Sequence, residues 1–150
     1  MLKSYEINSE TLAIIPISTK VSKVIEENEE FLISKRTFEI IDNSCKFFGS
    51  SYKGRYEGTK YLTGLSYKAP IVVEETKDII FFPTTSPRMD NCNWICLNKI
   101  SKYQREGQNS KIIFKNGLEL SLDMSYSSLE NQIMRSTLLE SIKRDRKKVH

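Results

Sequence analysis

The sequence predicts an α+β fold, a mostly antiparallel β-sheet with a central helical pair and a C-terminal helix. Three observations indicate this fold class. Short apolar segments of strand length, separated by turn residues, fill residues 3–34 and 70–123. Between them, residues 37–64 show the spacing of two helices. A further helix is expected from about Ser127 to Lys147.

The first 34 residues are expected to form strands joined by short turns. Residues 3–18 contain two apolar segments with a turn at 8–9 between them. Residues 21–26 and 30–34 are expected to form a hairpin whose tip, 27–29, is rich in glutamate. Residues 1–44 hold five basic and eight acidic groups, so part of this acidic excess lies in a solvated turn.

The spacing of the apolar residues then becomes helical. Four residues at i, i+3, i+7 and i+10 define one face of a helix: Phe38, Ile41, Cys45 and Phe48. Gly49 is placed to end this helix. Ser50 or Ser51 is expected to cap a second helix over residues 52–63, which Gly64 ends.

The second helix contains two interior glycines, Gly54 and Gly58. Each costs about 1 kcal/mol of helix stability relative to alanine. We therefore expect a neighbouring group or a ligand to approach the backbone there. A helix-turn-helix motif is disfavoured, because recognition helices are rarely this rich in glycine and because the flanking segments are expected to be strands.

Further strands are expected at 70–74, 78–82, 94–97, 111–115 and 118–123. The dipeptide Asn116-Gly117, flanked by alternating apolar residues, is the strongest hairpin signal in the chain. The polar segment between Pro83 and Trp94 contains Arg88 and is expected to be a loop, of the kind that often carries function. Trp94 itself is expected to anchor the core or the sheet edge.

The C-terminal helix has apolar stripes on two different sides. The first stripe is Tyr126, Leu129 and Ile133, and the second is Met134, Leu138 and Ile142. We expect the first to pack on its own domain and the second to form an oligomer interface. The alternative is a helix buried on both sides within one monomer. Ser127 and Glu130 have the spacing of a capping box.

The composition is that of a globular protein. The chain has 150 residues, 39% of them hydrophobic and 28% charged, and is expected to form one domain over 1–150. No apolar segment reaches the roughly 18 residues of a membrane span, so we expect a cytoplasmic protein without a membrane partner. The last ten residues carry five basic groups and one acidic group, which equals the net charge of +4. This basic end, 141–150, is expected to fray.

The sequence offers little for catalysis, and we expect no enzyme and no cofactor. The only histidine is His150, and no glycine-rich segment has the phosphate-loop spacing. Cys45, Cys92 and Cys96 are odd in number and lack the partners of a zinc site, so they are expected to be buried free thiols. The carboxylates at 74–78 are most simply the ends of a hairpin turn.

Residues 41–64 combine five aromatic side chains, four basic residues and four glycines, with only Asp42 and Glu57 acidic. Such a mixture suits a polyanion whose backbone must come close. Two alternatives stay open at this point. The segment is a packed helix pair with a solvated basic face, or it belongs to a non-catalytic protein-interaction module.

Several segments resemble the ComK family of competence transcription factors from Bacillus and related Firmicutes. They are IDNSCKFFGSSYKGRYEGTKYLTG, KAPIVV, FFPTTSP, CNWI, FKNG and SYSSLENQ, in one order over roughly residues 4–140. The resemblance implies a sequence-specific activator of DNA-uptake genes that binds paired A/T-rich promoter boxes, largely through the minor groove. It also implies homo-oligomers, dimers or tetramers, a place at the bacterial nucleoid, and partners that include RNA polymerase and a protease adaptor.

Candidate DNA contacts within the matching segments are Lys46, Lys53, Arg55, Lys60 and Arg88. Candidates beyond those segments rest on charge alone and are Lys143, Arg144, Arg146, Lys147 and Lys148. For each residue taken singly, the alternative is a solvated surface side chain. Family members continue into a further C-terminal segment, associated with adaptor recognition, whereas this sequence ends at His150. An inactive, truncated family member is therefore a further alternative.

Overall fold

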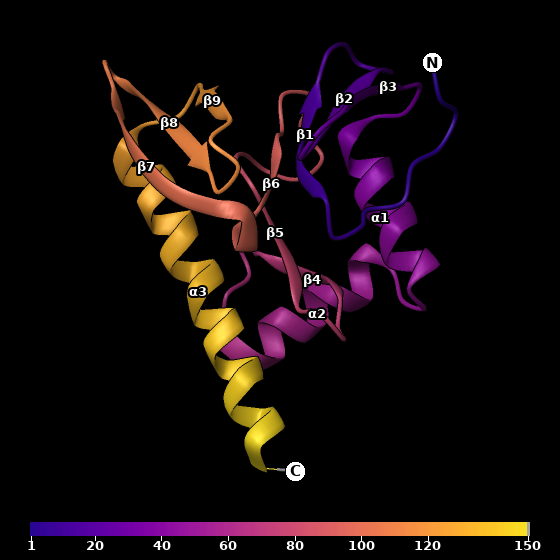
Figure 1. Ribbon diagram of the computed structural model, residues 1–150. Coiled ribbons are helices and arrows are strands. Elements are labelled where there is room, and N and C mark those ends of the chain that lie inside the picture. Colours follow the sequence, from indigo (N-terminus) through magenta and orange to yellow (C-terminus); the bar gives the residue numbers. More distant parts are fainter. Residues whose placement is uncertain (150) are drawn as a thin grey trace.

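Two antiparallel β-sheets and three α-helices make up the described part of the chain. The computed structural model describes residues 1–149, with side chains up to Lys147. A six-stranded sheet has the order β3-β2-β1-β6-β5-β4, and a three-stranded sheet has the order β7-β8-β9 (Figure 1). Every strand pair in both sheets is antiparallel. The predicted α+β class, with a central helical pair and a C-terminal helix, is confirmed.

The elements follow one another along the chain with short connections. The strands are β1 (Thr11–Pro16), β2 (Ser22–Glu26), β3 (Glu30–Ile33), β4 (Ile71–Glu74), β5 (Ile79–Pro83), β6 (Trp94–Cys96), β7 (Ile100–Glu106), β8 (Asn109–Phe114) and β9 (Glu119–Leu122). The helices are α1 (Thr37–Phe47), α2 (Tyr52–Thr63), the 3₁₀ turn η1 (Leu97–Lys99) and α3 (Tyr126–Val149). The predicted hairpins over 21–34, 70–82 and 111–123 are all present.

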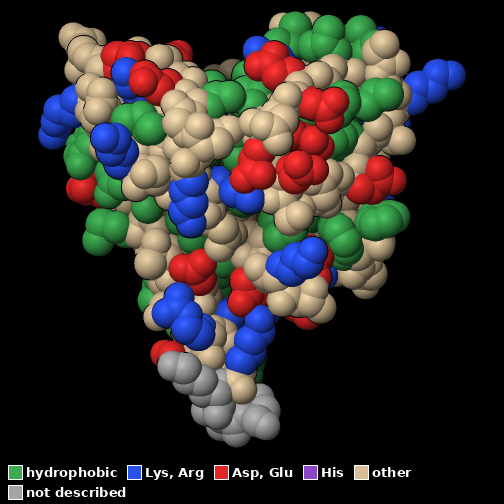
Figure 2. Space-filling model, in the orientation of Figure 1, with side chains coloured by type: hydrophobic (Ala, Val, Ile, Leu, Met, Phe, Trp, Pro, Cys, Tyr) green, Lys and Arg blue, Asp and Glu red, His purple; other side chains and the backbone are tan. Residues whose placement is uncertain are grey.

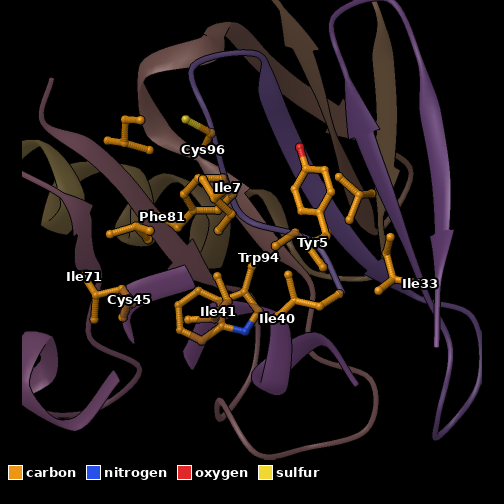
Figure 3. Packing of buried hydrophobic residues seen from close by; sticks show 14 of the residues in the cluster. Tyr5, Ile7, Ile33, Ile40, Ile41, Cys45, Ile71, Phe81, Trp94 and Cys96 are labelled. Carbon is orange, nitrogen blue, oxygen red and sulfur yellow. The ribbon is translucent and has the colours of Figure 1, made fainter. Parts of the chain in front are cut away.

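The six-stranded sheet is covered on both faces. On one face Ile41 and Cys45 of α1 pack in one cluster with Trp94 of β6 (Figure 3), and Tyr52 of α2 packs at the margin of this cluster. On the other face Ile95 of β6 packs in one cluster with Leu129 of α3 and with residues of the small sheet. Neighbouring residues of β6 therefore point into different cores, as the alternation of side chains along a strand requires.

The joint between α1 and α2 is held by polar groups at the helix ends. Ser51 caps α2 by accepting a hydrogen bond from the Gly54 backbone N–H at 3.0 Å. Asp42 Oδ1, from α1, accepts one from the Tyr52 N–H at 2.9 Å. Gly64 ends α2 in the left-handed conformation with φ of 79°, as predicted.

The buried face of α1 is rotated slightly from the face that the apolar spacing predicted. The fully buried apolar residues of this helix are Ile40, Ile41 and Cys45, and the Ser44 hydroxyl is buried beside them. Phe38 and Phe48, which the apolar spacing placed on the buried face, are only partly buried at its margins. Aromatic rings at the edge of a buried face add to the apolar contact area made by the smaller residues.

The strands differ from the prediction in two places. Residues 3–8 form no strand, although Tyr5 and Ile7 are buried as expected. The Ile7 N–H bonds to the Ser44 hydroxyl of α1 at 3.0 Å, so a helix side chain replaces the partner strand. Conversely, β7 was not predicted, because its residues are mostly exposed and carry no clear apolar alternation.

The start of α3 also differs from the prediction. The Ser125 hydroxyl accepts the hydrogen bond from the Ser128 N–H at 3.2 Å, so Ser125 caps this helix. The predicted capping box of Ser127 and Glu130 is therefore wrong. The Glu130 carboxylate instead accepts a hydrogen bond from the Tyr126 hydroxyl at 3.2 Å. Serines two positions apart offer the same capping chemistry, and only the path of the chain decides between them.

Replacing Trp94 with alanine is expected to lower the free energy of unfolding by about 3–5 kcal/mol, because its indole is fully buried between the sheet and the helices. Urea denaturation followed by circular dichroism measures this decrease. Phe47→Ala is the matched control, since this ring is 65% exposed and its removal should cost within about 0.5 kcal/mol. Equal decreases for the two variants would contradict the assignment of Trp94 to the core.

Asp42→Ala is expected to cost about 1 kcal/mol near pH 7, as for the removal of a helix cap. Partial burial raises the pKa of Asp42, but the Tyr52 N–H and the Lys46 ammonium lower that pKa by more, so the net pKa lies below its ordinary value. The stabilising effect is thus complete above about pH 4 and disappears as the carboxylate protonates at lower pH. Denaturation of both proteins across the acidic range up to neutral pH should show the difference shrinking below about pH 4; a constant difference would contradict this origin.

Candidate nucleic-acid interface

Two of the predicted DNA contacts, Lys53 and Lys60, lie on the outer face of α2. Both side chains are exposed, and neither has an ion-pair partner among the described residues. Their spacing of seven residues is two helical turns, so both point to the same side, with Glu57 between them. These lysines are available to an external anion.

Arg55 lies on the opposite side of the same helix and faces inward. Its Nη1 is 2.9 Å from Glu75 Oε1, and its side chain is only 13% exposed. Lys143 of α3 approaches the same oxygen at 3.6 Å and is 14% exposed. Both cations therefore belong to an ionic cluster between α2, the β4–β5 turn and α3, and the expectation that Arg55 is an exposed side chain is wrong.

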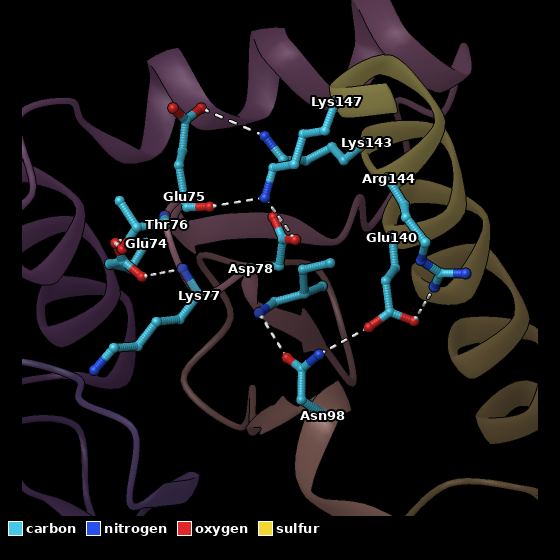
Figure 4. Close-up of polar contacts among 11 residues, drawn as sticks. Glu74, Glu75, Thr76, Lys77, Asp78, Asn98, Glu140, Lys143, Arg144 and Lys147 are labelled. Atoms are coloured by element: carbon cyan, nitrogen blue, oxygen red, sulfur yellow. Dashed lines mark hydrogen bonds and ion pairs between the residues drawn. The ribbon is translucent and has the colours of Figure 1, made fainter. Parts of the chain in front are cut away.

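The end of α3 carries the other predicted cations, and several are paired within the chain (Figure 4). Lys147 Nζ is 2.8 Å from Asp78 Oδ2, and Arg144 is 3.4 Å from Glu140 Oε1. Both side chains are nevertheless more than half exposed. The Arg146 guanidinium lies 5.9 Å from the centre of the exposed Tyr61 ring of α2. The Lys148 side chain lies outside the described residues.

The remaining two candidates lie outside α2 and α3. Lys46 is exposed at the end of α1 and is 3.0 Å from Asp42 Oδ2. The Arg88 guanidinium stacks over the Phe38 ring at 4.3 Å, in the loop before β6. Stacking of this kind orients an exposed guanidinium without neutralising its charge.

Five of the candidate cations are exposed on α2 and on the last turns of α3, two helices that contact each other. We call them the α2–α3 basic surface: Lys53, Lys60, Arg144, Arg146 and Lys147. Figure 2 shows basic side chains around the lower part of α3, with a few acidic ones between them. Lys46 lies on α1 and Arg88 in the loop before β6, so neither is on these two helices.

Two exposed aromatic side chains that lie beside cations were not predicted as contacts. Tyr61 is 81% exposed and Tyr67 is 70% exposed, and each has a cation over or beside its ring. A further cation–aromatic pair joins the small sheet to α3, where Arg105 of β7 stacks on Tyr126 at 4.7 Å. In the sequence, aromatic and basic residues alternate, but this alternation does not show which aromatic rings are exposed.

The second apolar stripe of α3 divides into exposed and half-buried parts. Met134 is 63% exposed and Leu138 is 43% exposed, whereas Ile142 is half-buried. The buried side of the helix instead includes two polar residues, Gln132 and Ser136. The alternative in which both stripes are buried within one monomer is therefore wrong.

No metal-binding cluster comes together in the described residues. Groups of three or more His, Cys, Asp or Glu side chains placed to hold a metal ion do not occur there. Cys45, Cys92 and Cys96 are buried free thiols, as predicted, and burial raises the pKa of Cys45 to about 12. None of the helices in the described part of the chain has the length and apolar character needed to cross a membrane.

Comparison with known proteins matches residues 2–148 to the family described as ComK protein. A Bacillus subtilis (strain 168) protein named Competence transcription factor is 39% identical over 149 residues, which cover 97% of this chain and 78% of that protein. No solved structure matches the chain. The family match spans nearly every element described above, from the first strand to the end of α3, and it confirms the resemblance found in the sequence. The chain belongs to the ComK family.

Proposed function

We propose that this protein is a DNA-binding transcriptional activator of competence genes. The observation that carries the proposal is the similarity, over 97% of the chain, to a protein named Competence transcription factor. The proposed role is binding and recruitment without catalysis, at the nucleoid in the cytoplasm. The proposed DNA sites are paired A/T-rich boxes, read mainly through the minor groove.

The α2–α3 basic surface supports this proposal physically. Exposed lysines and arginines release counterions when they bind phosphates, which makes the affinity depend steeply on salt. Within this surface, Lys53, Lys60 and Arg146 have no ion-pair partner among the described residues. Arg and Lys side chains also favour the narrow minor groove of A/T-rich DNA, where the negative potential is strongest. The exposed Tyr61 beside Arg146 adds an aromatic surface next to these cations.

Binding is expected to be tighter for a duplex with two A/T boxes than for a duplex of equal length with scrambled boxes. Fluorescence anisotropy across a series of salt concentrations measures both affinities, and a minor-groove drug serves as competitor. Selective, drug-sensitive binding supports the proposal. Equal affinity for both duplexes, dependent on salt alone, would mean that the surface binds polyanions without sequence selectivity. No binding to either duplex would overturn the DNA-binding role.

The variant for the same titration is Lys53→Ala combined with Lys60→Ala. Because both side chains are exposed, stability should change by no more than about 0.5 kcal/mol for each. DNA affinity should fall, and the slope of log affinity against log salt should decrease by about one for each phosphate that the variant no longer neutralises. Lys20→Ala combined with Lys35→Ala is the charge-matched control away from this surface and should bind like the unmodified protein.

We further propose that the exposed part of the second stripe on α3, Met134 and Leu138, binds a second copy of the chain. Two apolar side chains one turn apart can pack on their own copies across a two-fold axis. Small polar residues beside them, Thr137 and Ser141, let two helices approach closely. Paired A/T boxes also match a protein that is itself paired.

Leu138→Asp is expected to shift the protein from a concentration-dependent oligomer toward the monomer in sedimentation-velocity experiments, because it places a charge at the proposed contact. The fold should be retained, since Leu138 is 43% exposed. Leu2→Asp is the matched control, because Leu2 is 45% exposed at the other end of the molecule. A monomer at every concentration of the unmodified protein would contradict the interface.

A further inference from the structure

A small pocket lies where α2 crosses β4 and α3. Its volume is about 100 Å³, which is room for several water molecules or one small anion. Gly54, Arg55 and Gly58 line it from α2, Glu75 from the β4–β5 turn and Lys143 from α3. The pocket faces away from Lys53 and Lys60, which project from the other side of the helix.

The charges in this pocket do not balance. Arg55 Nη1 at 2.9 Å and Lys143 Nζ at 3.6 Å both approach one oxygen, Glu75 Oε1. The two cations are only 13% and 14% exposed, whereas Glu75 is 58% exposed. Charges withdrawn from water are costly unless they are fully paired. Two mostly buried cations thus share one carboxylate that remains largely in solvent.

Arg55 also has a donor that is not used. Its Nε is buried and has no hydrogen-bond partner among the described residues. A guanidinium presents its N–H groups as a planar fork that fits two oxygens of a phosphate or carboxylate. The single contact to Glu75 leaves part of that fork free for a second acceptor.

Gly58 keeps the pocket open. A Cβ added at Gly58 would meet no other atom of the chain within 4 Å, so internal packing does not require glycine there. Glycine inside a helix is less stable than alanine. Gly58 is part of the pocket wall, and we expect a methyl group there to narrow the pocket. A ligand in the pocket would account for the glycine, whereas packing among the described residues does not.

We propose that this pocket binds a phosphate group, held by the Arg55 guanidinium and the Lys143 ammonium. The Glu75 carboxylate contacts these cations when phosphate is absent and moves into solvent when phosphate binds (Figure 4 shows its position beside Lys143). The phosphate belongs either to a free phosphate-bearing molecule or to a nucleic-acid backbone. Both present the same tetrahedral oxygens to the pocket.

Inorganic phosphate, titrated into the full chain labelled with ¹⁵N at constant ionic strength, is the first probe. The amide signals of Gly54, Gly58 and Thr59 should shift and saturate. Gly58→Ala should weaken phosphate binding about tenfold, while its thermal midpoint rises because alanine is the better helix former. Weaker binding in a more stable variant cannot be attributed to unfolding.

Glu75→Gln should tighten phosphate binding about threefold, because it removes the competing carboxylate. Glu57→Gln changes the net charge equally on the outer face of α2 and should leave phosphate binding unchanged. Shifts that do not saturate, or equal affinities for Gly58→Ala and the unmodified chain, would overturn the proposal. Equal tightening in both glutamate variants would also overturn it, since the effect would then be general electrostatics.

A second titration distinguishes the two sources of phosphate. If a DNA duplex displaces inorganic phosphate from the pocket in the unmodified chain, the phosphate that binds there comes from the nucleic-acid backbone. If the duplex leaves phosphate binding unchanged, the ligand is a free phosphate-bearing molecule. Either outcome supports the pocket. The titration with phosphate alone needs no DNA, so its result does not depend on the proposed function.

Discussion

The burial of β6 on both faces is the constraint on which the rest of the structure depends. Trp94 fills the core under α1 and α2, and the next residue, Ile95, fills the core under the small sheet and α3. A strand of this kind needs a covering layer on each side, because either face would otherwise expose a large apolar surface. The helical pair and the small sheet with α3 are the two layers that meet this need.

Charged side chains tie the two layers together at one edge of the sheet. The β4–β5 turn places Glu75 and Asp78 between α2 and α3, where they contact Arg55, Lys143 and Lys147. Ionic contacts between partly exposed groups add little stability, but they fix which cations point inward and which outward. This selection leaves Lys53, Lys60 and Arg146 exposed and without an ion-pair partner among the described residues.

Much of the fold could be predicted from local patterns. Turn residues and apolar alternation located the hairpins, and Ser51 and Gly64 marked the two ends of α2. The strand expected near Tyr5 failed because its burial arises from contact with α1. Strand β7 was not predicted because its mostly exposed residues show no apolar alternation. Pairing with β8 stabilises it instead. For the candidate interface, the charge of the sequence identified the segments that carry basic residues, but not which of these residues are exposed.

The sequence alone determined the family, the α+β class, the order of most elements and the two regions where basic residues gather, because these depend on residue types and local spacing. Only the tertiary structure decided which basic residues remain free. Whether a cation faces solvent or an internal carboxylate depends on how helices cross, and Arg55 and Lys53, two residues apart, point in opposite directions. Their partners are distant in the sequence, so no local pattern records them.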